Sequence, residues 1–316
     1  MLDLVTPTLN QLKYIDFVDQ TKPRRWIIPI PALNHRRHHR STITSLLLMS
    51  LLLVGGHASA QLPATPKIGQ EGKDVPWVPT PDVLVDKMLE MAAVTPDDVV
   101  IDLGSGDGRT VIAAAQLGAR AIGVELEENL VTLSRQRAEE AGVSSLTEFY
   151  ATDLFEFDLS PATVITMFLL PDINYQLRPH LLELTPGTRI VSNTWDLSGA
   201  EGNFEAPGWL PDETVVIDPC PTWCTSLLWV VPAKVEGTWQ LGEQEMELQQ
   251  QFQRFTGQLR YEGRLLAIEQ GRIHGTELSF QLNNRRYTGS VEEQTMSGFA
   301  STPDGDSENW QATRRN

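Results

Sequence analysis

The sequence predicts an α/β protein: a mostly parallel sheet with helices on both faces, followed by a small antiparallel β unit. Short, nearly all-apolar runs such as Val99–Leu103 alternate with amphipathic segments, a pattern typical of parallel strands buried on both faces. After Gly237 the pattern changes to short alternating runs that end at Gly or Asn, which indicates antiparallel strands joined by tight turns.

The composition indicates a folded globular chain with an uneven charge. Its 316 residues, 41% of them hydrophobic, suffice for two folded units. The net charge of -16 is divided into +4 over residues 1–60 and -20 over the remainder. Because nucleic-acid affinity depends mainly on neutralising phosphates, an acidic body argues against a nucleic-acid partner.

Residues 1–60 have the order of a secretory leader. The cationic stretch NHRRHHR (34–40) precedes the apolar run Ile43–Val54 and the small-residue triplet Ala58–Ala60, as in a cleavable signal peptide. The apolar run is shorter than the roughly 20 residues of a membrane span. An uncleaved anchor that associates the protein with the membrane is the alternative. Either way, we expect an exported or periplasmic body, or one anchored by the signal sequence.

The first folded unit is expected over residues 80–233, after an extended lead-in at 61–79 that is rich in Pro and Gly. Thr80 is a candidate N-cap, with Pro81 at the first helical position. Five strands separated by helices follow, and two further strands form an antiparallel hairpin. The strands are expected at Val99–Leu103, Ala119–Leu126, Leu146–Asp153, Thr163–Leu170 and Thr188–Trp195, and the hairpin at Glu213–Asp218 and Ser226–Ala233.

Residues 237–316 are expected to form a small β-meander or partial barrel. Its His274 lies in a predicted strand and carries no evident chemistry. The two cysteines, Cys220 and Cys224, have no His pair nearby, so we expect no metal site. The spacing leaves open whether they form a disulfide or remain thiols.

The stretch VVIDLGSGDGR (99–109) places three glycines between a predicted strand and a predicted helix. The spacing G-x-G-x-G has no P-loop lysine and differs from the G-x-G-x-x-G of dinucleotide sites. Asp102 and Asp107 would repel a pyrophosphate, whereas they suit a cationic ligand. S-adenosylmethionine (SAM) carries a sulfonium and an ammonium, so the loop favours SAM over NAD.

Two further acids end the next strands along the chain. Glu125 ends the second predicted strand, where a carboxylate can accept hydrogen bonds from ribose hydroxyls. Asp153 ends the third, where a carboxylate can accept a hydrogen bond from an adenine amino group. Together with the glycine loop, in register with the strands, these acids predict a SAM site.

Several motifs in the first unit resemble one family. They are VPTP (78–81), VIDLGSGDGR (100–109), GVEL (123–126), DLF (153–155), TVITMFLLP (163–171) and PGTRIVS (186–192). They look like the class I, seven-strand protein-lysine methyltransferases, which include the mitochondrial enzymes for the ATP synthase c subunit and the adenine nucleotide translocase. The resemblance covers roughly residues 78–233 and implies a Rossmann-like sheet with a terminal antiparallel hairpin.

The resemblance also implies roles for particular residues. The methionine end of SAM would be lined by Asp102, Gly104, Ser105, Gly106 and Gly108. Glu125 would hold the ribose, Asp153 and Leu154 would hold the adenine, and Thr80 would close the site.

The implied acceptor is a lysine of a protein, including a membrane protein. The segment Phe168–Pro171 stands where enzymes that methylate nucleic-acid amines carry [DN]-P-P-[YF], and it has no side chain that hydrogen-bonds a planar amine. Asn193 and Trp195, at the end of the fifth predicted strand, are candidate substrate contacts. The sequence identifies no general base.

Two other functions remain open. One is a methyltransferase for a small molecule or lipid. The other is an exported, non-catalytic binding protein that keeps the fold, because SAM is made in the cytoplasm. Because SAM is made in the cytoplasm, a cytoplasmic location is the alternative to export.

Overall fold

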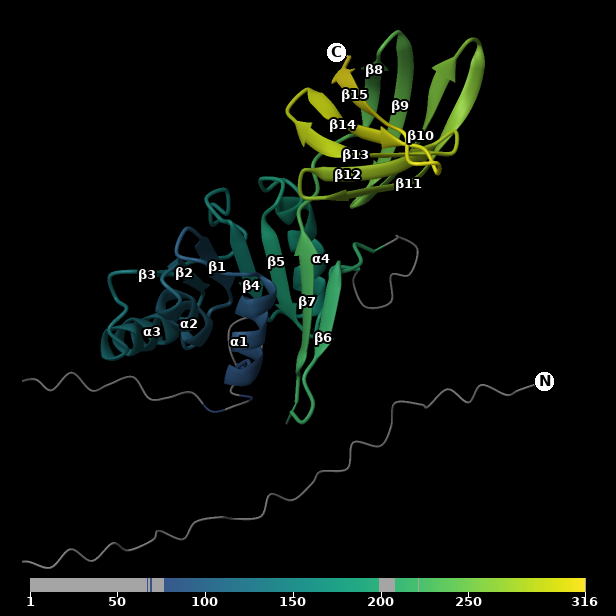
Figure 1. The fold of residues 1–316 in the computed structure, drawn as a ribbon. Helices are drawn as coiled ribbons and strands as arrows, with labels where there is room; N and C mark the ends of the chain where they lie inside the picture. Colours follow the sequence, from purple (N-terminus) through teal and green to yellow (C-terminus); the bar gives the residue numbers. More distant parts are fainter. Residues whose placement is uncertain (1–66, 68, 70–76, 199–207, 221, 316) are drawn as a thin grey trace, which may run out of the picture. The chain divides into compact units, whose positions relative to one another are not determined.

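A computed structural model describes residues 67, 69, 77–198, 208–220 and 222–315. Within them the chain forms a seven-stranded sheet flanked by helices and a closed barrel of eight strands (Figure 1). The predicted leader, including the apolar run Ile43–Val54, lies outside the described residues. No helix in the described ranges is long and apolar enough to cross a membrane.

The sheet has the order β3-β2-β1-β4-β5-β7-β6 (Figure 1). Strands β1 to β5 are parallel, and β7 runs antiparallel to both β5 and β6, so the predicted terminal hairpin is present. The strands are β1 Val99–Leu103, β2 Arg120–Glu125, β3 Thr147–Ala151, β4 Val164–Met167, β5 Arg189–Asn193, β6 Glu213–Val216 and β7 Thr225–Val230.

Helices cover both faces of this sheet, as the apolar strand pattern predicts. The helices are α1 Asp82–Met91, α2 Arg109–Gln116, α3 Glu128–Glu140 and α4 Pro171–Leu181. Leu84, Val111 and Val131 of the first three pack with Val100 in one core. Leu177 of α4 packs with Ile101 in the other core. The neighbouring residues Val100 and Ile101 therefore bury opposite faces of β1.

The direction of the chain across the sheet reverses at β1. Leu103 pairs with Val124 of β2 on one side and with Met167 of β4 on the other. In open α/β sheets the ligand site lies at this reversal, beyond the carboxyl ends of the strands. The fold therefore places a site after Leu103, at the glycine loop.

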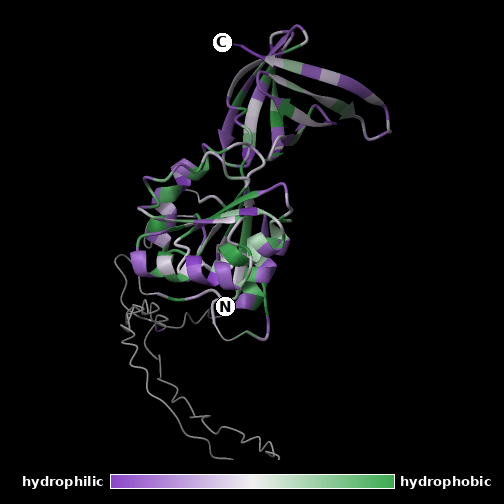
Figure 2. Cartoon of the chain, turned by 90° about the vertical axis from the view of Figure 1, so that its left-hand side faces the viewer, coloured by the Kyte–Doolittle hydropathy of each residue, from purple (hydrophilic) through white to green (hydrophobic). Residues whose placement is uncertain are grey.

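The second β unit closes completely. Strand β8 pairs with β15 at one side and with β9 at the other, which seals the ring. Hydrophilic and hydrophobic bands alternate along these strands (Figure 2). The strands are β8 Gly237–Leu241, β9 Gln244–Gln251, β10 Arg254–Tyr261, β11 Arg264–His274, β12 Glu277–Leu282, β13 Arg285–Glu292, β14 Thr295–Ser301 and β15 Ser307–Arg314.

The interior of the barrel is filled by aromatic rings. The Phe280 ring stacks on Tyr287 with centroids 4.6 Å apart, and Trp310 meets Phe280 edge-on at 5.6 Å. An eight-stranded barrel is just wide enough for side chains to fill. The described barrel interior is therefore a hydrophobic core.

The structure corrects one sequence prediction, the N-cap of α1, and answers one open question, the state of the two cysteines. The Thr80 side chain does not cap α1: the N-cap is Pro81, and no side chain caps the helix. The Pro81 carbonyl accepts hydrogen bonds from Leu84 N and Val85 N, so the helix begins one residue later than predicted. The Thr80 hydroxyl instead accepts a hydrogen bond from Asn193 Nδ2 at 3.3 Å. Cys220 and Cys224 form a disulfide, which decides the alternative left open above.

Candidate active site

The glycine loop joins β1 to α2 with three residues in the left-handed backbone region. The φ angles are +71° at Gly104, +55° at Gly106 and +79° at Gly108. A Cβ on Gly104 would lie 2.9 Å from Leu169 Cδ2, and a Cβ on Gly106 would lie 2.9 Å from Trp77 Nε1. Glycine is therefore required both for the backbone conformation and for the close approach of these side chains.

Glu125, at the end of β2, holds the same loop. Its Oε2 accepts a hydrogen bond from Gly106 N at 2.9 Å, and its Oε1 accepts one from Glu127 N at 3.0 Å. Each carboxylate oxygen has a further lone pair. The carboxylate can therefore hold the loop and still accept hydrogen bonds from a ligand.

Asp107 is buried between two arginines. Its oxygens accept hydrogen bonds from Arg109 Nε at 2.9 Å and Nη2 at 2.7 Å, and its Oδ2 also pairs with Arg137. Burial alone raises the pKa of this carboxyl, but the hydrogen bonds and charges of Arg109 and Arg137 hold it below its usual value. Its charge is thus compensated within the protein, so Asp107 does not supply the preference for a cation that its sequence position suggests.

Asp102, at the end of β1, has the opposite environment. Among the described residues no cation contacts it: its Oδ1 accepts a hydrogen bond from Thr166 Oγ1 at 2.7 Å, and Thr110 supplies a second one. The pKa of Asp102 is raised to about 7, mainly by burial. The nearby charges of Glu125 and Asp107 also raise it, whereas the two threonine hydrogen bonds lower it. The group gains from any cation placed beside it.

A cavity of about 440 Å³ brings most of the predicted site residues together. Its lining includes eight of them: Thr80, Asp102, Gly104, Ser105, Gly106, Glu125, Asp153 and Leu154. They come from the lead-in to α1 and from the ends of β1, β2 and β3. Parallel strands end at one edge of a sheet, which is why residues far apart in the sequence converge here.

Three predicted residues do not line this cavity. Gly108 faces α3, where a Cβ would lie 2.7 Å from Ser134 Cβ. Asn193 is fully buried; its amide donates to Thr80 Oγ1, and its Oδ1 accepts from Thr194 Oγ1 at 2.8 Å. Trp195 is half-buried and contacts another ring, Trp223. Asn193 and Trp195 therefore lie beside the cavity, not in it.

Sequence reasoning missed several lining residues. Trp77 lines the cavity from the lead-in, and Phe168 and Leu169 line it from the segment after β4. The sequence places Phe168–Pro171 at the position of the amine-binding motif of other methyltransferases, and its position after a strand end is the signal that assigns it to the cavity. Trp77 stands in an irregular segment that carries no periodic signal.

The donors and acceptors at the cavity fit SAM. An ionisable buried carboxyl, Asp102, is available to a cation, and the buried Ser105 Oγ has no hydrogen-bond partner among the described residues. The volume lies within the range of about 300–1,000 Å³ for small-molecule sites. No group of three or more His, Cys, Asp or Glu in the described part of the chain is placed to hold a metal ion.

The raised pKa of Asp102 predicts a stabilising variant. An acid whose pKa is higher in the folded state keeps its proton there while the unfolded chain loses it, so stability falls as pH rises from about 4 to about 7. Asp102→Asn removes this loss and should stabilise the free protein above pH 7 by on the order of 4 kcal/mol. Urea unfolding of the wild type and the variant at pH 4.5 and 8 measures this difference in unfolding free energy. An equal difference at the two pH values would contradict the raised pKa of Asp102.

A protein-family model and several known proteins match parts of this chain. The ANTKMT methyltransferase domain matches residues 102–204. A protein-lysine N-methyltransferase of Saccharolobus islandicus is 42% identical over 147 residues, which are 46% of this chain and 86% of that protein. The Xenopus laevis lysine N-methyltransferase for the ATP synthase c subunit is 37% identical over 44% of this chain, and the chain spans only 57% of that protein.

One solved structure is also similar to half of the chain. It is an RNA methyltransferase from Salinibacter ruber in complex with S-adenosyl-L-homocysteine, 46% identical, covering 50% of this chain and 96% of that one with a TM-score of 0.45. The match to most of the Saccharolobus islandicus enzyme, together with the domain match, shows that this chain belongs to the SAM-dependent protein-lysine N-methyltransferase family.

Proposed function

We propose that this protein methylates a lysine amine in a segment of a membrane protein. The observation that carries the proposal is the cavity wall after β4. Phe168, Leu169 and Leu170 line the cavity where an enzyme for planar amines needs hydrogen-bonding groups. An aliphatic amine needs no such groups, and apolar surroundings favour its neutral, reactive form. The relatives named for the ATP synthase c subunit and for adenine nucleotide translocase support a membrane-protein acceptor.

Different residues of the cavity are proposed to bind different parts of SAM. SAM, when bound, supplies an electrophilic methyl group: the amine lone pair forms the new C–N bond, the C–S electron pair stays with sulfur, and the amine proton passes to water. All three acids line the cavity, where Asp102 would face the cationic end of SAM, Glu125 would hold the ribose and Asp153 would hold the adenine. Positioning and exclusion of water then carry much of the rate.

Transfer of label from methyl-tritiated SAM tests the acceptor class. The purified chain, incubated with a membrane-protein extract, should incorporate label into protein, and mass spectrometry should locate it on lysine. A matched reaction with Asp102→Asn should lose at least tenfold in rate at low SAM concentration. Label that partitions with lipid or small molecules, or that enters RNA added in a parallel reaction, would refute a protein-lysine acceptor.

SAM affinity should depend on pH through Asp102. A cationic ligand favours the ionised carboxylate, so binding below pH 7 must release the proton that Asp102 holds in the free protein. Affinity should therefore fall by up to tenfold per unit as pH decreases from 7 to 5.5. Isothermal titration in two buffers of different ionisation enthalpy counts the released proton. Asp102→Asn should bind SAM more weakly and without this pH dependence; an unchanged pH profile in the variant would contradict the role.

We also propose that the folded part of the protein is exported, because residues 1–60 have the order of a secretory leader. The disulfide between Cys220 and Cys224 agrees with an oxidising compartment. A reporter that is active only outside the cytoplasm, fused after Gln61, should be active. A reporter confined to the cytoplasm would favour the alternative location, where SAM is made.

A further inference from the structure

Three aromatic rings gather beside the cavity. Trp223 lies between the other two, with its ring centroid 5.6 Å from Trp195 and 6.3 Å from Phe168. The three residues come from separate segments, after β4, after β5 and before β7. We call them the aromatic cluster. Neither its membership nor its position follows from local sequence.

The strand register places this cluster next to the glycine loop. Leu103 pairs with Met167, Met167 pairs with Ser192, and Asn193 pairs with Ser226. The residues that follow β1, β4 and β5 therefore lie in a row along one edge of the sheet, beside the residues that precede β7. Phe168 belongs both to the cluster and to the cavity lining, so the cluster begins where the cavity ends.

Trp223 has the features of a ligand-contacting residue. It is 43% exposed, and its φ of +56° is in the left-handed region that residues other than glycine rarely adopt. A large apolar ring that is exposed in an unfavourable backbone conformation is not explained by core packing, and such conformations gather at functional sites.

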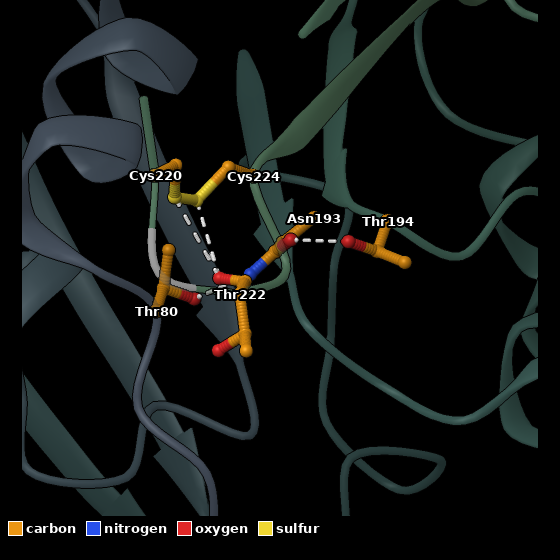
Figure 3. The surroundings of a disulfide bond; sticks show 6 residues. All are labelled: Thr80, Asn193, Thr194, Cys220, Thr222 and Cys224. Atoms are coloured by element: carbon orange, nitrogen blue, oxygen red, sulfur yellow. Dashed lines mark hydrogen bonds between the residues drawn. A yellow bond between two sulfur atoms is a disulfide. The ribbon is translucent and has the colours of Figure 1, made fainter. Parts of the chain in front are cut away.

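The disulfide constrains the loop that carries this ring. Cys220 and Cys224 flank Trp223, and their bond closes a short loop just before β7. Figure 3 shows Thr80 and Asn193 in the surroundings of the disulfide, joined by their hydrogen bond. Thr80 lines the cavity, so the closed loop lies next to the cavity wall.

Asn193 fixes the second ring of the cluster. Its buried Oδ1 accepts the Thr194 hydroxyl hydrogen bond, Thr194 has a φ of +63°, and Trp195 N donates to Asn193 O at 2.7 Å. These contacts determine where the chain leaves β5. Asn193 is thus a positioning residue for Trp195.

We propose that Phe168, Trp195 and Trp223 enclose the alkylammonium chain of the methyl acceptor, and that the Cys220–Cys224 disulfide holds Trp223 in the enclosure. The proposal rests on the proposed function. Aromatic faces attract an ammonium within about 6 Å of the ring centroid, and they contact an alkyl chain equally well. The attraction requires the cation to lie over a ring face but needs no N–H donor, so the enclosure accepts an amine before and after methylation.

A bisubstrate probe tests the enclosure directly. In the probe, nitrogen replaces the sulfur of S-adenosylhomocysteine and carries an ethylene link to a butylammonium chain. The whole chain should bind this probe at least tenfold more tightly than S-adenosylhomocysteine. Trp223→Ala should lose most of this gain and keep its affinity for S-adenosylhomocysteine within about twofold, and Trp223→Phe should restore part of the gain. Tyr261→Ala, which removes an equally exposed ring in the barrel, is the matched control and should change neither affinity.

The outcomes separate this proposal from the proposed function. Equal binding of the probe by the wild type and Trp223→Ala would overturn the enclosure and leave the methyltransferase activity standing. Failure of the wild type to bind S-adenosylhomocysteine would instead overturn the proposed function. A probe with an ether oxygen in place of the ammonium should bind more weakly; equal affinity would overturn recognition of the cation.

Reduction tests the role of the disulfide. Dithiothreitol, or Cys220→Ser combined with Cys224→Ser, should lower probe affinity about as much as Trp223→Ala. Reduction of Trp223→Ala should add no further loss, because the disulfide is proposed to act through that ring. If the reduced wild type still binds the probe as much more tightly than S-adenosylhomocysteine as the oxidised protein does, the disulfide does not position Trp223.

Discussion

The buried carboxylate of Asp107 is the contact on which the geometry of the site depends. Arg109 joins it to the lead-in segment through a hydrogen bond to Thr80 O at 3.0 Å, and Arg137 joins it to α3. A buried carboxylate that loses its partners costs several kcal/mol, so the loop cannot leave the arginines without a large penalty. The left-handed glycines and the adjoining cavity wall are therefore fixed together.

Asp102 and Asp107 lie five positions apart, yet their environments give them opposite tasks. Asp107, held by Arg109 and Arg137, has a lowered pKa and serves the fold. Asp102 has hydroxyl partners only, and burial raises its pKa. Its ionisation costs stability in the free protein and is favoured by a cationic ligand. Of these two acids, Asp102 is therefore the one whose charge is left for a cationic ligand to compensate.

The acids of the site were predictable because strand ends can be located from the apolar runs. Asp102, Glu125 and Asp153 each follow or end such a run, and parallel pairing brings them to one edge. Trp223 was not predictable in this way, since it stands in a disulfide-closed loop and meets Phe168 only in the folded chain. The predicted capping by Thr80 was wrong because α1 begins one residue later, with Pro81 at the N-cap, and the Thr80 hydroxyl contacts Asn193, which is distant in sequence. Closure of the barrel depends on β8 meeting β15, a pairing that local alternation does not encode.

The arrangement along the sheet edge suggests how a lysine could become reactive without a dedicated base. On the β1, β2 and β3 side the cavity is lined by carboxyl groups, and after β4 it is lined by Phe168, Leu169 and Leu170. An ammonium at the exposed face of Trp223 is stabilised by the ring and by water. The same group, once past Phe168, loses its hydration, and desolvation lowers its pKa. On the proposal above, the charged form would be recognised beside Trp223, and the neutral form would be favoured beside Leu169 and Leu170, where the methyl group would be transferred.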